Sequence, residues 1–126
     1  PFGFGLSYTD FKYSNFNLSS DNLKGNQTLT INVNIANTGK FDGEEVVQLY
    51  IRDLFGKVVR PIKELKGFQK IFLKKGENKN VTFKLTTEDL KFYDDALNYD
   101  WEAGEFEIMV GTNSSDVMTK KIVWEK

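Results

Sequence analysis

The segment from Leu29 to Ile35 alternates strictly between apolar and polar residues. Leucine, isoleucine or valine occupies every odd position, and threonine or asparagine occupies every even one. A period of two predicts a strand with one face on a core and the other in water. We therefore expect the odd-numbered side chains of this segment to be buried and the even-numbered ones to face solvent.

The same alternation recurs at 47–51, 81–85 and 106–110, and more weakly at 11–13 and 122–124. Turn residues separate these runs, among them Asn37-Thr38-Gly39, where we expect glycine to supply a positive φ. Thr86-Thr87-Glu88-Asp89 fits a capping box and predicts one short helical turn. About seven or eight short antiparallel strands with almost no helix predict an all-β, two-sheet sandwich of the fibronectin-III or immunoglobulin type. A small closed barrel is the alternative.

The composition excludes several classes of partner and of catalytic chemistry. Its 126 residues support one domain, and a net charge of −1 provides no field to attract nucleic acid. The longest apolar run is far too short for a membrane-spanning helix. Histidine and cysteine are both missing, which removes the commonest general base and the usual transition-metal ligands. We therefore expect no nucleic-acid or membrane partner, no bound metal and no cofactor.

Two pairs of adjacent carboxylates are the obvious catalytic candidates, Glu44-Glu45 and Asp94-Asp95. Adjacent residues of a strand point to opposite faces, so neither pair would converge on a substrate bond if extended. Glycoside hydrolysis requires two carboxyl groups across a cleft, one of them held protonated. We interpret both pairs as solvated acids and assign no catalytic residue.

Aromatic residues cluster at Tyr93, Tyr99 and Trp101. Exposed rings can stack on sugars, so this cluster is a possible sugar contact. Tyr and Trp also close the ends of β-sandwiches, with the ring inside and the polar tip in water. We favour the second interpretation.

Two stretches carry an excess of apolar and basic residues. Phe2, Phe4 and Leu6 alternate with glycine at the start of the chain, which suggests a segment of a longer polypeptide. The stretch Arg60–Phe68 combines basic residues, a proline and apolar anchors. Because Pro61 cannot donate a hydrogen bond to a sheet ladder, we expect an edge strand or a crossover there.

Several of these segments together resemble the C-terminal domain of glycoside hydrolase family 3 enzymes, chiefly β-glucosidases. The resemblance covers nearly the whole chain, and no single motif carries it alone. The matching segments, in the family's order, are Pro1–Thr9, Asn37–Gly39, Gly43–Tyr50, Arg60–Phe68, Asp89–Asp94, Gly104–Phe106 and Val110–Gly111.

The resemblance implies a fibronectin-III-like module at the end of a multidomain hydrolase. Residues 1–9 would be an apolar connection from a preceding α/β sandwich domain, and residues 10–126 the β-sandwich. In that family the aspartate nucleophile and the acid/base glutamate lie on domains that precede this segment. The module would then be non-catalytic, and would stabilise and position the barrel and α/β sandwich domains of the parent chain.

We expect docking on those domains to involve nine residues of the two stretches described above. They are Phe2, Phe4, Leu6, Tyr8, Arg60, Pro61, Lys63, Glu64 and Phe68. The alternative is a carbohydrate-binding or adhesion-type module. For the parent enzyme we expect an extracellular or periplasmic location rather than a cytoplasmic one, although this segment carries no targeting signal.

Overall fold

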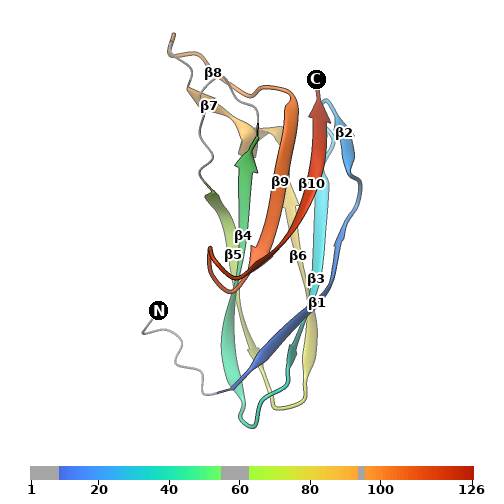
Figure 1. The fold of residues 1–126 in the computed structure, drawn as a ribbon, viewed down its shortest axis with the longest axis vertical. Helices are drawn as coiled ribbons and strands as arrows, with labels where there is room; N and C mark the ends of the chain where they lie inside the picture. The colour runs from blue at the N-terminus through green and yellow to red at the C-terminus, as the bar shows by residue number, and fades with distance from the viewer. Residues whose placement is uncertain (1–8, 55–62, 94–95) are drawn as a thin grey trace.

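The computed structural model describes residues 9–54, 63–93 and 96–126. Its strands form two facing sheets that run along the long axis of the molecule (Figure 1). The smaller sheet has the strand order β1 (Phe11–Leu18), β3 (Leu29–Asn37), β6 (Asn78–Leu85). The larger sheet has the order β2 (Asn22–Lys24), β10 (Val117–Glu125), β9 (Gly104–Gly111), β4 (Gly43–Asp53), β5 (Glu64–Leu73). A separate hairpin pairs β7 (Phe92–Tyr93) with β8 (Tyr99–Asp100).

This arrangement confirms the predicted all-β sandwich. All strand pairs are antiparallel apart from β2, which pairs in parallel with β10. The described residues form ten strands, and the excess over the expected number comes from β2, β7 and β8. These strands have only two or three residues, too few for a periodic pattern to reveal them.

The core lies between the two sheets. Leu29, Ile31, Val33 and Ile35 are completely buried, as their odd positions predict. The even-numbered residues between them keep contact with solvent. The larger sheet supplies the facing layer, whose buried members include Val47, Leu49, Ile51, Phe106, Ile108, Val110, Ile122 and Trp124.

The predicted helical turn is present as η1 (Thr87–Leu90), a single 3₁₀ turn. Asp89 accepts a hydrogen bond from the backbone N–H of Thr86 over 2.8 Å, and Thr86 accepts one from Glu88 over 3.3 Å. This reciprocal pairing is the capping box that the sequence indicates. Leu90 is buried beneath the turn, which leads the chain from β6 into the β7–β8 hairpin.

The strand β5 forms one edge of the larger sheet, as Pro61 led us to expect for this stretch, although Pro61 itself lies outside the described residues. At the end of the sandwich where β4 finishes, the β7–β8 hairpin projects beyond the sheets (Figure 1). The turns after β3 and β5 lie at the opposite end. Within the described part of the chain, no helix is long and apolar enough to cross a membrane.

Candidate functional site

The side chain of Asn37 holds the point where the chain enters the sandwich. It is 2% exposed, and its Oδ1 accepts hydrogen bonds from Thr9 Oγ1 over 2.7 Å and from the Gly39 N–H over 3.1 Å. Its Nδ2 donates to the carbonyls of Phe41 at 2.8 Å and Leu73 at 3.1 Å. Because every polar atom of this buried amide is satisfied, Thr9 is held in one place.

Gly39 completes this attachment by its lack of a side chain. The sequence predicts a positive φ there, and that prediction is wrong, since the positive-φ glycines in the described residues are others. A Cβ on Gly39 would instead lie 1.9 Å from Thr9 Oγ1 and 2.4 Å from the Asp10 nitrogen. The neighbouring Thr38 N–H donates to the Asp10 carbonyl over 2.9 Å. The turn therefore packs closely against the backbone of Thr9 and Asp10.

Three large apolar side chains are exposed on the outer side of β5, with Lys70 between two of them. Leu65, Phe68 and Phe72 are 51%, 63% and 55% exposed, and all three lie on the side of the sheet that faces away from the core. We call these three residues the β5 face. Single exposed apolar residues are common, but three on one edge strand form a patch of the kind that marks an interaction site.

A bulge brings Leu65 onto this face. Phe68 lies opposite Gln48, and Leu65 lies opposite Tyr50, two residues further along β4. Three positions separate Leu65 from Phe68, so in a regular strand they would point to opposite faces. The register shifts between them, which leaves Lys66 as an extra residue on β5. Alternation alone could not reveal this, because a bulge leaves no periodic signal.

The outer face of the smaller sheet has a different character. Asn34 donates to Asn80 over 3.0 Å, and Thr82 donates to Asn32 over 2.6 Å. These amide and hydroxyl groups bond to one another across β3 and β6, and they remain accessible to water. The two outer faces therefore differ: one is polar, with Lys12 and Lys84 beside these amides and hydroxyls, and the other carries the β5 face.

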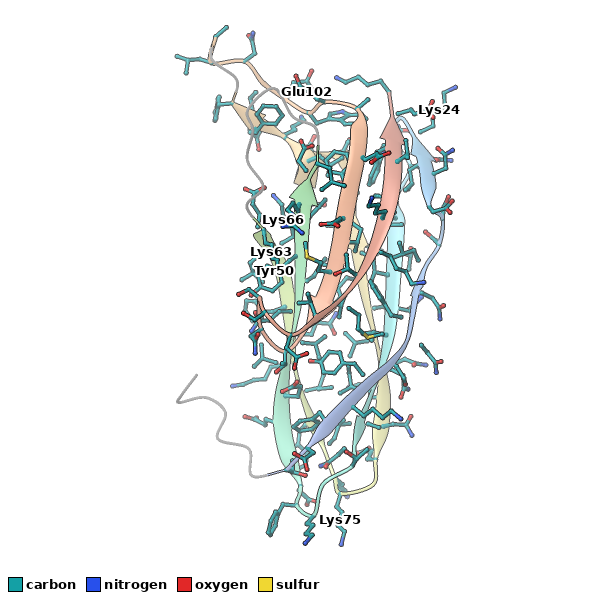
Figure 2. All side chains as sticks on the ribbon, viewed as in Figure 1. Lys24, Tyr50, Lys63, Lys66, Lys75 and Glu102 are labelled. Carbon is teal, nitrogen blue, oxygen red and sulfur yellow. The ribbon has the colours of Figure 1, made fainter. Side chains whose placement is uncertain are left out.

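The charged residues predicted for docking are partly engaged within the domain. Lys63 donates to the carbonyl of Ser114 over 2.5 Å, and Lys66 lies 3.7 Å from the carboxylate of Glu64. Figure 2 shows Tyr50, Lys63 and Lys66 on the same side of the molecule, over β4 and β5. Lys63 thus contacts the β9–β10 loop, and the side chain of Glu64 is mainly exposed.

Six of the predicted docking residues lie outside the described residues. They are Phe2, Phe4, Leu6, Tyr8, Arg60 and Pro61. Of the remaining three, Phe68 is exposed and forms part of the β5 face.

The aromatic cluster separates into a buried part and an exposed part. Trp101 is 8% exposed and packs edge-on against Trp124, with 6.3 Å between the ring centroids. Tyr93 and Tyr99 form a cross-strand pair on the hairpin and are 65% and 52% exposed. Trp101 therefore closes the end of the sandwich, and the two tyrosines are the rings available to a ligand.

The partly buried carboxylates have structural partners. Glu107 is bonded to Arg52 at distances of 2.6 and 2.8 Å, and Glu45 accepts a hydrogen bond from the Tyr13 hydroxyl over 2.7 Å. Glu44 points away from Glu45 toward Lys70, 4.0 Å distant, as alternation predicts. Asp94 and Asp95 lie outside the described residues. Across the described ranges, His, Cys, Asp and Glu form no group of three or more that could hold a metal ion.

Comparison with known proteins identifies the domain type. Residues 45–114 match the model of the fibronectin type III-like domain. The chain is 44% identical over 125 residues to thermostable β-glucosidase B of Acetivibrio thermocellus, a match that covers 98% of this chain and 16% of the relative. It is also 44% identical to a periplasmic β-glucosidase of Salmonella typhimurium, a match covering 93% of this chain and 15% of that protein.

A solved structure agrees with these relatives. The β-glucosidase of Listeria innocua, crystallised in complex with gluconolactone, superposes with a TM-score of 0.91 at 38% identity. That match covers all of this chain and 17% of the crystallised one. This chain thus spans about one sixth of the length of the proteins that it matches, at their C-terminal end. It belongs to the fibronectin type III-like domain family, as the type found in family 3 β-glucosidases.

Proposed function

We propose that this chain is a non-catalytic accessory domain of a β-glucosidase-like family 3 glycoside hydrolase, which docks on the catalytic domains and positions them. The observation that carries the proposal is the coverage of the matches: nearly the whole chain aligns, but only with about one sixth of each relative. The remaining five sixths of such a polypeptide are available to carry the catalytic groups.

The chemistry of the described carboxylates supports a non-catalytic role. Hydrolysis of a glycosidic bond requires two carboxyl groups roughly 5–10 Å apart on either side of a sugar. Glu107 is bonded to Arg52 on the paired strand β4, and Glu45 is bonded to Tyr13 on β1 of the facing sheet, so both carboxylates have structural roles. We therefore infer that hydrolysis of O-glycosyl bonds belongs to other parts of the parent chain.

Two attachments would allow the domain to hold its neighbours in place. The first is the covalent connection to the chain that precedes Thr9. Its exit point is fixed by the hydrogen bond between Thr9 and Asn37. The second is the β5 face, an apolar patch of the kind that buries at interdomain contacts. Two points of attachment restrict rotation far more than one. In an enzyme with catalytic groups on different domains, small misplacements are costly in rate.

The full set of predicted docking residues remains part of this proposal, with Phe68 as its best-supported member. We also propose an extracellular or periplasmic location for the parent enzyme. The periplasmic relative from Salmonella typhimurium supports it.

The test uses the full-length polypeptide that carries this segment. Replacing Phe68 and Phe72 by serine should lower its melting temperature and its rate of hydrolysis of an aryl β-glucoside. Phe41→Ser is the matched control, because Phe41 is 58% exposed and lies outside the β5 face. Equal melting temperatures and rates in all variants would contradict docking through this face.

The chain alone should not hydrolyse the same aryl β-glucoside. Turnover by the purified 126-residue chain that disappears on replacing Asp94 or Asp95 by asparagine would contradict the non-catalytic role.

A further inference from the structure

The β7–β8 hairpin presents two tyrosine rings to solvent. Tyr93 and Tyr99 lie directly opposite each other, with ring centroids 4.7 Å apart and ring planes tilted by 38°. Although each ring covers part of the other, they remain 65% and 52% exposed. The hairpin projects to the side at one end of the sandwich (Figure 1), and the exposed fractions of the two rings place them outside the core.

The turn of this hairpin adds a second unusual feature. Leu97 has a φ of 65°, a left-handed conformation that leucine adopts at a cost in free energy, and its side chain is 77% exposed. Neither the conformation nor the exposed side chain contributes to the core. Strained backbone of this kind is concentrated at ligand-contacting segments.

Charged groups flank the rings. Lys91 Nζ lies 5.6 Å from the centroid of Tyr99 and 2.7 Å from a carboxylate oxygen of Glu88. On β8, Asp100 pairs with Lys126 over 3.2 Å. Both ion pairs are partly exposed, and the Lys91–Glu88 pair presents a hydrogen-bond donor and acceptor beside the Tyr99 ring.

We propose that this hairpin is a contact site for oligosaccharides of pyranoses with equatorial hydroxyl groups, with a pyranose ring stacked on Tyr93. A pyranose with equatorial hydroxyl groups exposes axial C–H bonds on its faces, which pack well on an aromatic ring. Its hydroxyl groups then point sideways, where the ammonium group of Lys91 lies beside the rings. Tyr93 carries the stack because the ammonium group of Lys91 lies over the ring of Tyr99.

Trp101 has a supporting part in this site. It is buried, and Lys126 Nζ lies 4.9 Å from its ring centroid. It therefore holds the base of the hairpin and does not touch the sugar. The site does not depend on docking, because the three residues of the β5 face lie on another strand.

The test measures binding of cellohexaose and laminarihexaose to the purified chain by amide chemical shifts. We expect millimolar binding, with the largest shifts in β7 and β8. Tyr93→Ala should weaken it by about tenfold or more, whereas Tyr93→Phe should retain it because the ring is kept. Phe68→Ala is the control and should bind like the unmodified chain. Unchanged shifts outside the hairpin verify that each variant is folded.

Three results would overturn the proposal. One is the lack of any shift at about 10 mM sugar, far above the expected dissociation constant. Another is equal binding by the unmodified chain, Tyr93→Ala and Tyr99→Ala. The third is a Tyr93→Ala variant that lowers the melting temperature of the full-length enzyme while the unmodified chain binds no sugar. That outcome would make the hairpin a second protein contact, and it would leave docking through the β5 face untouched.

Discussion

The hydroxyl of Thr9 donates a 2.7 Å hydrogen bond to Oδ1 of Asn37, 28 residues further along the chain. Asn37 ends β3 and is the buried polar side chain of the described core. The contact therefore joins the first described residue to the turn between the two sheets. The turn therefore does more than reverse the chain, because its contact with Thr9 determines where the preceding segment leaves the domain.

Replacing Asn37 by alanine should lower the free energy of unfolding by about 2–3 kcal/mol, because two backbone carbonyls and the Thr9 hydroxyl lose their partner. Asn34→Ala is the matched control. Asn34 lies on the same strand, but its hydrogen bonds to Asn78 and Asn80 are exposed, so its loss should cost less than about 1 kcal/mol. Urea unfolding measures the free energy of unfolding of the two variants. Equal losses would show that the buried hydrogen bonds of Asn37 stabilise the domain no more than the exposed ones of Asn34.

Gly39→Ala should lower the free energy of unfolding by about 1–3 kcal/mol, since its new methyl group would overlap Thr9 and the backbone of Asp10. Gly67→Ala provides the comparison. A Cβ there would meet only the ring of Phe83 at 3.6 Å, an ordinary contact, so stability should change by less than about 1 kcal/mol. Thermal unfolding measures both. A harmless Gly39→Ala would show that the incoming chain can move aside.

Tyr13 should make the stability of the domain fall at high pH. Burial, and then the negative charge of Glu45, raise the pKa of Tyr13 above its usual value of about 10. Above pH 10 the unfolded chain therefore loses the tyrosine proton while the folded protein keeps it. The unfolded state then binds fewer protons, so stability decreases as pH rises, by up to about 1.4 kcal/mol per pH unit.

Tyr13→Phe removes this dependence, so its free energy of unfolding should decline less steeply than that of the unmodified protein above pH 10. Glu45→Gln should keep most of the steep decline, because burial is the larger cause of the raised pKa. Urea unfolding between pH 8 and 11 compares the three proteins. Parallel curves for the unmodified protein and Tyr13→Phe would contradict the assignment.

Regular features of the fold could be predicted from the sequence because each leaves a repeating signal. The burial of Ile31 and Val33 follows from alternation, and the capping box at Thr86 follows from the spacing of Thr86 and Asp89. The bulge at Lys66 has no such signal. It depends on pairing with β4, a contact between residues distant in sequence, and it moves Leu65 onto the outer face.

The roles of particular residues were harder to predict than the strands. Gly39 shows why. A glycine in a turn usually indicates an unusual backbone conformation, but here glycine is required because Thr9 approaches too closely for any side chain. Asn37 likewise matched a turn motif, while its burial depends on Leu73 and Thr9, which are far away in sequence. Trp101 and Tyr99 are neighbours in one aromatic cluster, and only the fold separates the buried ring from the exposed one.

The β5 face should make the isolated chain associate with itself. An exposed edge strand with apolar side chains pairs readily with another copy when no other domain covers it. Phe68→Lys should therefore shift sedimentation velocity profiles toward monomer. Since Phe68 is 63% exposed, the free energy of unfolding should change by less than about 1 kcal/mol.

Phe41→Lys is the control for this experiment, because it makes the same change in charge at a residue that is 58% exposed but lies outside β5. If association arises from β5, Phe41→Lys should associate like the unmodified chain while Phe68→Lys does not. Equal suppression by both variants would point to a general effect of added charge. In that case the β5 face would have no special affinity for another surface, and the argument for docking through Phe68 would fail with it.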